Sequence, residues 1–217
     1  MYICGVKNIG KIKRIFVWLS RISHCRGFGI QSPWAYNVSR YVINEHWRYY
    51  RYAEIEKGLG RLSAVERKLG QLYFRLANFV QPFYFAELGH DKRRAGIIER
   101  YVQSGCERCV TVNCSDMASV PVPCDEARAI GKRENNARLI LVVDGASADA
   151  KEIANLCSNL IIHDYIIIED IAAEPKAKAA WAELKESLQG VLLFDLYYAG
   201  VIFVDPARYK QHYIINF

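Results

Sequence analysis

The sequence predicts an α/β fold: a doubly wound, mostly parallel sheet that ends in an antiparallel β-hairpin and is preceded by helices. Two observations favour it. From residue 83 on, short apolar runs alternate with helical stretches, which is typical of parallel βαβ units with right-handed crossovers. Before that point the apolar residues recur at three- and four-residue steps, which indicates helices.

The parallel part of the sheet is predicted from four short runs rich in apolar residues, at 84–88, 109–112, 139–143 and 165–168. The stretches at 91–103, 148–160 and 175–188 have helical patterns. The last two runs, 191–197 and 201–205, are separated by a tight Ala199-Gly200 turn and predict the hairpin. Residues 213–217 are expected to add a short terminal strand.

Three helices are predicted in the N-terminal part, at residues 6–23, 32–50 and 61–79. Ser32 and Pro33 begin the second helix as N-cap and first helical residue, and Pro82 follows the third. The second helix carries many aromatic side chains, which favour burial. We therefore expect residues 1–80 to form a helical extension packed on a core domain of residues 81–217.

The composition is that of a globular protein. The chain has 217 residues, of which 52% are hydrophobic and 24% charged, enough to form a core without metal or disulfide staples. It has seven cysteines, an odd number, and no segment that resembles a signal peptide. No window reaches about 18 uncharged apolar residues. These features predict a cytoplasmic protein with reduced thiols and no transmembrane segment.

The N-terminal part is strongly basic. Residues 1–44 contain no Asp or Glu and carry Lys7, Lys11, Lys13, Arg14, Arg21, Arg26 and Arg40. This asymmetry predicts contact of the segment from Lys7 to Arg26 with a polyanion, which leaves open a nucleic acid, a phosphate-bearing substrate or a membrane surface. The alternative is a basic helix that is merely solvated.

Five segments, taken in order, carry a family resemblance. They are Gly27-Phe28-Gly29-Ile30-Gln31-Ser32-Pro33-Trp34, Phe85-Ala86-Glu87-Leu88-Gly89, Leu141-Val142-Val143-Asp144-Gly145, Ile166-Ile167-Ile168-Glu169-Asp170-Ile171 and Leu193-Phe194-Asp195-Leu196-Tyr197-Tyr198-Ala199-Gly200-Val201. Through them the chain, from about residue 24 on, resembles class I S-adenosylmethionine-dependent methyltransferases. The similarity is to a poorly characterised bacterial group with a helical N-terminal extension.

The resemblance implies a Rossmann-like methyltransferase sheet and methyl transfer from S-adenosylmethionine to an oxygen or nitrogen nucleophile of an unknown substrate. It also implies site residues. The cofactor would be lined by Glu87, Leu88, Gly89, Asn113, Asp144 and Gly145. The nucleophile would be assisted by His90 or Asp170.

The chain departs from the family pattern in three places. Lys92, Arg93 and Arg94 stand where the family has small residues, with Arg93 at the position of a second glycine. Asn113 replaces the acidic residue that accepts the ribose hydroxyls. About 25 residues separate the second and third strands, too few for the usual helix and strand, so this edge is expected to be remodelled, with a short helix near 125–131. From Arg93 we expect weak cofactor binding and a preference for anionic ligands.

Two other clusters have alternative interpretations. Asp144 with Glu169-Asp170 can hold a divalent metal, or form a turn and a helix cap. Cys106 and Cys109, with Cys114 and Cys124 further on, suggest zinc or a redox pair, or else buried thiols. We favour the second interpretation of each and predict no resident metal.

Two functions of different class remain open. The first is an enzyme in which the cofactor carries the methyl group and the protein orients substrate and sulfonium. The second is a pseudo-methyltransferase that keeps the fold, has lost the chemistry and acts as a binding or interaction module.

Overall fold

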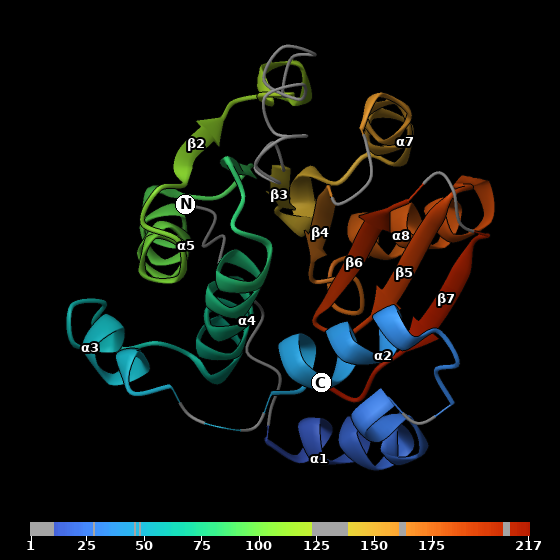
Figure 1. Cartoon of the computed structure of the whole chain (residues 1–217), viewed down its shortest axis with the longest axis horizontal. Helices are drawn as coiled ribbons and strands as arrows, with labels where there is room; N and C mark the ends of the chain where they lie inside the picture. The colour runs from blue at the N-terminus through green and yellow to red at the C-terminus, as the bar shows by residue number, and fades with distance from the viewer. Residues whose placement is uncertain are drawn as a thin grey trace.

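Seven strands form one sheet with helices on both faces (Figure 1). The structure is a computed structural model that describes residues 11–27, 29–45, 47, 49–122, 139–160, 164–205 and 209–217. In space the strands follow the order β2-β1-β3-β4-β6-β5-β7. Their bounds are β1 Tyr84–Leu88, β2 Val110–Cys114, β3 Leu139–Val143, β4 Tyr165–Glu169, β5 Val191–Asp195, β6 Ala199–Val204 and β7 Gln211–Ile214.

Among the described strands, β6 alone runs against its neighbours. β1 pairs in parallel with β2 and β3, β3 with β4, and β5 with β7, whereas β6 is antiparallel to both β4 and β5. The predicted α/β fold, a doubly wound and mostly parallel sheet with a C-terminal antiparallel pair, is confirmed. β2 lies on one side of β1 and β3 lies on the other. After β2 the chain therefore crosses back over β1 and adds the next strands in the opposite direction, which puts a switch point between β1 and β3. Such a switch point is where open α/β sheets bind ligands.

The helices precede and connect the strands. They are α1 Lys11–Ser20, η1 Ile22–Gly27, α2 Pro33–Val38, the π-helical η2 Ser39–Ile43, α3 Arg51–Lys57, α4 Ala64–Val80, α5 Lys92–Gly105, η3 Met117–Ser119, η4 Gly145–Ser147, α7 Ala150–Asn159 and α8 Pro175–Ser187. In the described part of the chain, none of them combines the length and the apolar character that crossing a membrane requires.

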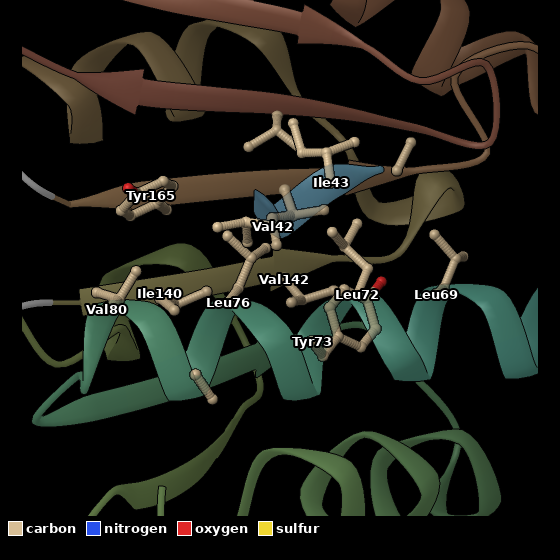
Figure 2. Close-up of a cluster of buried hydrophobic side chains, with 14 of the residues drawn as sticks. Val42, Ile43, Leu69, Leu72, Tyr73, Leu76, Val80, Ile140, Val142 and Tyr165 are labelled. Carbon is tan, nitrogen blue, oxygen red and sulfur yellow. The ribbon is translucent and has the colours of Figure 1, made fainter. Parts of the chain in front are cut away.

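The sheet has a hydrophobic core on each face. On one face α2, η2, α4 and α5 pack against the strands, and Figure 2 shows Leu72, Leu76 and Val80 of α4 beside Ile140 and Val142 of β3. On the other face α7 and α8 cover the alternate side chains of the same strands. The side-chain period of two along each strand therefore divides the apolar residues between the two cores.

The predicted helix at 32–50 is wrong in its second half, because it ends at Ile43 and α3 begins only at Arg51. The buried side chain of Arg75, on α4, explains the ending. Its Nε and Nη2 atoms donate to the carbonyl oxygens of Val42 (2.5 Å) and Ile43 (3.1 Å), which would otherwise serve a continuing helix. The sequence around Val42 and Ile43 carries no signal for these hydrogen bonds from a distant helix.

The C-terminal hairpin was predicted with its turn a little too late. The turn lies at residues 196–198, where Tyr197 has φ +70° and its N–H donates to Asp195 Oδ1 at 3.0 Å. Gly200 belongs to β6, and a Cβ there would come within 2.6 Å of the Trp181 ring, so this glycine serves close packing against α8. The terminal strand predicted at 213–217 is β7, Gln211–Ile214.

The short helix predicted near 125–131 lies outside the described residues.

Candidate functional site

Three parallel strands bring their carboxyl ends together at the switch point. β1 contributes Glu87, Leu88 and the loop that follows them, and β3 is followed by Asp144 and Gly145. β4, which neighbours β3, ends in Glu169 and is followed by Asp170. Most residues that the sequence singled out therefore lie along one edge of the sheet, which we call the carboxyl edge.

A buried series of paired polar and charged side chains lies at this edge. One carboxylate oxygen of Glu169, Oε1, accepts hydrogen bonds from the Tyr73 hydroxyl and from Arg94 Nη2. The other, Oε2, is 3.5 Å from His90 Nε2, and His90 Nδ1 is 2.8 Å from Glu87 Oε2. The side chains of Glu169 and His90 are both 1% exposed. The edge thus contains a buried charge network of Tyr73, Glu87, His90, Arg94 and Glu169.

Burial and pairing act in opposite directions on the pKa values in this network. Burial alone would raise the pKa of Glu169, but the adjacent Arg94 guanidinium and His90 hold it well below its usual range. Burial alone would lower the pKa of His90, but its hydrogen bonds to Glu169 and Glu87 raise it to about 9. At neutral pH, His90 is therefore an imidazolium held between two carboxylates.

A second group of carboxylates lies beside the buried network, formed by Asp144, Asp170 and Glu174. A Cβ built on Gly145 would lie 3.2 Å from the Cβ atoms of both Asp170 and Glu174. Burial, together with the charges of Glu169 and Asp144, raises the pKa of Asp170 to about 7. Burial is also the main cause of the raised pKa of Asp144. Burial therefore comes first in both shifts, and the negative charge of Glu169 adds to each of them.

Gly89 forms the turn that follows β1. Its φ of +87° lies in the left-handed region, and a Cβ there would come within 2.1 Å of Ser147 Oγ. The space that the glycine leaves free is thus occupied by a side chain from the loop after β3. A ligand that passes close to Gly89 requires the Ser147 side chain to turn away.

Asn113 lies apart from the charge network, although it pairs in register with Glu87. It is exposed on β2, at the edge of the sheet in the described part of the chain. Asp116, two residues after β2, caps η3, where its Oδ1 accepts from the Ser119 N–H at 2.8 Å.

The two arginines after Gly89 have different surroundings from those expected. Arg93 was expected to enter the cofactor space, but its side chain is 56% exposed and pairs with Glu66 of α4. Arg94 is the buried one, and its charge is matched by Glu169. The arginine charge that motivated a preference for anionic ligands is therefore neutralised by carboxylates of the chain itself.

The buried cysteines that the structure describes have the surroundings of inert thiols. Cys106, Cys109 and Cys114 are buried and unbridged, and burial raises the pKa of Cys109 to about 12. Cys124 lies outside the described residues. Over the part of the chain that the structure describes, no three His, Cys, Asp or Glu side chains are grouped so that they could hold a metal ion.

Sequence reasoning missed two members of the charge network. Tyr73 lies on α4 at a helical core spacing, where an aromatic residue carries no functional signal. Arg94 was noted only as bulky, because its burial depends on Asp91 beginning α5: the Asp91 carboxylate accepts from the Arg94 N–H at 2.8 Å. The available signal for Arg94 was its position three residues after Asp91, the predicted N-cap of α5.

Comparison with solved structures gives a distant structural likeness. No family model and no curated protein matches the sequence. The crystal structure of the SAH-bound Podospora anserina methyltransferase PaMTH1 is similar with a TM-score of 0.42 and 14% sequence identity, over 85% of this chain and 98% of that one. The sheet topology of this chain, and not that distant likeness, carries the fold assignment.

Proposed function

We propose that this chain binds S-adenosylmethionine at the carboxyl edge, between β1 and β3, and transfers its methyl group to an oxygen or nitrogen nucleophile. The observation that carries the proposal is the excess of negative charge at this edge. Two cations, Arg94 and His90, lie among five carboxylates, which are Glu87, Asp144, Glu169, Asp170 and Glu174. A site with this charge favours a cationic ligand, and S-adenosylmethionine carries a fixed positive charge on its sulfur.

Buried polar atoms without a hydrogen-bond partner also fit the amino-acid part of the cofactor. Glu87 Oε1 is a free acceptor, and Arg94 Nε and Nη1 are free donors. Burying such groups unpaired costs free energy, so a ligand that satisfies them gains affinity. An ammonium group complements Glu87, and a carboxylate complements Arg94. Leu88, Gly89, Gly145 and the exposed Asn113 would complete the cofactor contacts that the family resemblance implies.

The bound cofactor supplies the electrophilic methyl group, and the chain must orient the substrate and accept its proton. Asp170 suits that task, because it is only partly buried and its pKa of about 7 leaves a basic carboxylate near neutral pH. His90 suits it less, since it is already protonated and enclosed between Glu87 and Glu169. We therefore assign the base to Asp170 and a positioning role to His90.

One observation favours the second candidate, a binding module without methyl transfer. The Ser147 side chain fills the space beside Gly89 that the family leaves open for the cofactor. If Ser147 keeps this position, the edge holds the fold together and offers no room for the ligand. The function would then reside on another surface of the molecule.

Calorimetry with two ligands separates the candidates. S-adenosylmethionine and S-adenosylhomocysteine differ by one methyl group and by the charge on sulfur. We expect the native protein to bind S-adenosylmethionine more tightly, and Asp170→Asn to reduce that preference. Glu183→Gln is the matched control, because Glu183 lies on the exposed side of α8. Absence of binding of both ligands would rule out the enzyme and leave the binding module.

A further inference from the structure

The first described helix has an unusual distribution of side chains. Ile15, Phe16, Trp18, Leu19 and Ile22 are each between 49% and 66% exposed, although all are large and apolar. Ile15, Trp18 and Leu19 follow the i, i+3, i+4 spacing that puts residues on one face of α1, and Ile22 begins η1 directly after it. In a helix that packs on its own protein, such a stripe would be buried. We call these five residues the apolar stripe.

Polar contacts, rather than the apolar stripe, fasten this segment to the rest of the chain. Arg21 donates to the Asp195 backbone carbonyl at 3.0 Å and forms an ion pair with the Asp195 carboxylate at 2.8 Å. Asn216 donates to the carbonyl oxygens of Trp18 (3.2 Å) and His24 (3.1 Å). Figure 1 shows α1 at the outside of the molecule, next to the C-terminus. The helix is therefore held with a charged residue inward and apolar residues outward.

The charge around the stripe indicates what covers it. Residues 1–44 contain seven Lys and Arg residues and no acidic residue. A second copy of this chain would bring two such positive segments together, which is unfavourable. A nucleic acid would neutralise the charge but leave the aliphatic side chains in water. An anionic lipid surface satisfies both, since it attracts the cations and takes up the apolar side chains.

A recess beside the apolar stripe has a lining that suits an anionic lipid. It has a volume of about 410 Å³ and is lined by Ile15, Trp18, Tyr198 and Phe217, with Lys68 at its wall. The Lys68 ammonium lies 4.7 Å from the centre of the Phe217 ring. An apolar recess with a cation at its wall complements an acyl chain below a phosphate headgroup.

We propose that α1 and the start of η1 form an in-plane anchor that binds the surface of a membrane rich in anionic lipids. The apolar stripe inserts at the level of the headgroups, and the exposed Lys13 contacts lipid phosphates. Trp18 lies at the interface depth that tryptophan prefers. The recess borders the same end of the sheet, since the Asp170 N–H donates to the Tyr198 carbonyl oxygen at 2.7 Å, but no residue of the charge network lines it. The inference therefore does not depend on whether the carboxyl edge binds S-adenosylmethionine.

Co-sedimentation of the full chain with vesicles tests the anchor. One set of vesicles is phosphatidylcholine alone, and the other is phosphatidylcholine mixed with phosphatidylglycerol. We expect binding to the mixed vesicles only, weakened by salt, and weakened at least about tenfold by the double substitution Phe16→Ser with Trp18→Ser. Trp47→Ser is the matched control, because Trp47 is 85% exposed outside the stripe and its loss should leave binding unchanged.

Three results would overturn the proposal. The first is equal vesicle binding by the native protein and the double variant. The second is a native dimer in light scattering that the double variant converts to a monomer, without vesicle binding by either; the stripe would then be a dimer interface. The third is salt-sensitive retention on single-stranded DNA without any vesicle binding, which would assign the basic segment to nucleic acid.

Discussion

The carboxyl edge and the α1 segment distribute polar and apolar groups in opposite ways. At the carboxyl edge, charged side chains are buried, and each charged member of the network faces an opposite charge of the same chain. In α1, apolar side chains are exposed and the helix is attached through Arg21 and Asn216. Buried charge is costly unless it is paired, and exposed apolar area is costly unless it is covered. The first region pairs its charges within the chain and leaves a few polar atoms of Glu87 and Arg94 without a hydrogen bond, whereas the second leaves a whole apolar face uncovered.

The largest expected effect comes from breaking the buried network. Glu169→Ala should lower the free energy of unfolding by about 3–5 kcal/mol, because it leaves the Arg94 charge buried without its partner. Urea unfolding measures the change. Glu183→Ala, on the exposed side of α8, should change it by less than about 0.5 kcal/mol. Equal effects of the two substitutions would contradict the assignment of Glu169 to the centre of the network.

The pH dependence of stability should report His90. Its pKa is raised from 6.5 to about 9 on folding, so between these values the folded chain holds a proton that the unfolded chain has lost. The stabilisation is complete below about pH 6.5 and is lost as the pH rises through about 9, a decline of up to about 3 kcal/mol.

His90→Asn should remove that decline, measured as the difference between the two unfolding curves across this range. A variant whose stability falls with pH as steeply as that of the native chain would exclude His90 as the group responsible.

A smaller effect is expected at Gly89. Gly89→Ala should cost about 2 kcal/mol, since the residue keeps a positive φ and the new methyl group meets Ser147. Ser147→Gly in the same chain should recover part of the loss, because it removes the clash and leaves the backbone strain. Strictly additive effects in the double-mutant cycle would show that the two residues do not share this space.

The smallest effect is expected in α1. The double substitution Phe16→Ser with Trp18→Ser should change the free energy of unfolding by less than about 0.5 kcal/mol per residue, because both side chains are already exposed. Thermal unfolding without lipid measures this. A loss as large as that of Glu169→Ala would mean that the stripe is part of the core, and the contrast between the two regions would disappear.

The sequence predicted most of the sheet, because strand signals are local. The runs at 84–88 and 139–143 match β1 and β3 exactly, since each is a short apolar segment bounded by turn residues. The extent of the second helix could not be predicted in the same way, because Arg75 ends it from a helix more than thirty residues away. Tertiary hydrogen bonds of this kind leave no mark on the segment that they terminate.

The candidate site was predicted in its position but only partly in its chemistry. Glu87 lies at the end of β1, and Asp144 and Asp170 directly follow β3 and β4, so the meeting of these carboxyl ends brings the three together. The electrostatic interpretation failed at Arg93, because the side-chain direction in the first turn of α5 decides which arginine is buried. The charge balance at the carboxyl edge depends on the directions of these two arginine side chains, and sequence spacing alone does not give those directions.

The carboxyl edge, as proposed, is a site for a cation, and the affinity for S-adenosylmethionine as a function of pH tests this most directly. Because the pKa of Asp170 is about 7, raising the pH from about 6 to about 8 ionises this carboxylate next to the ligand. We predict that the native protein binds S-adenosylmethionine about tenfold more tightly at the higher pH. Asp170→Asn should show little pH dependence. An affinity that is the same at both pH values, or that falls as the pH rises, would contradict the claim.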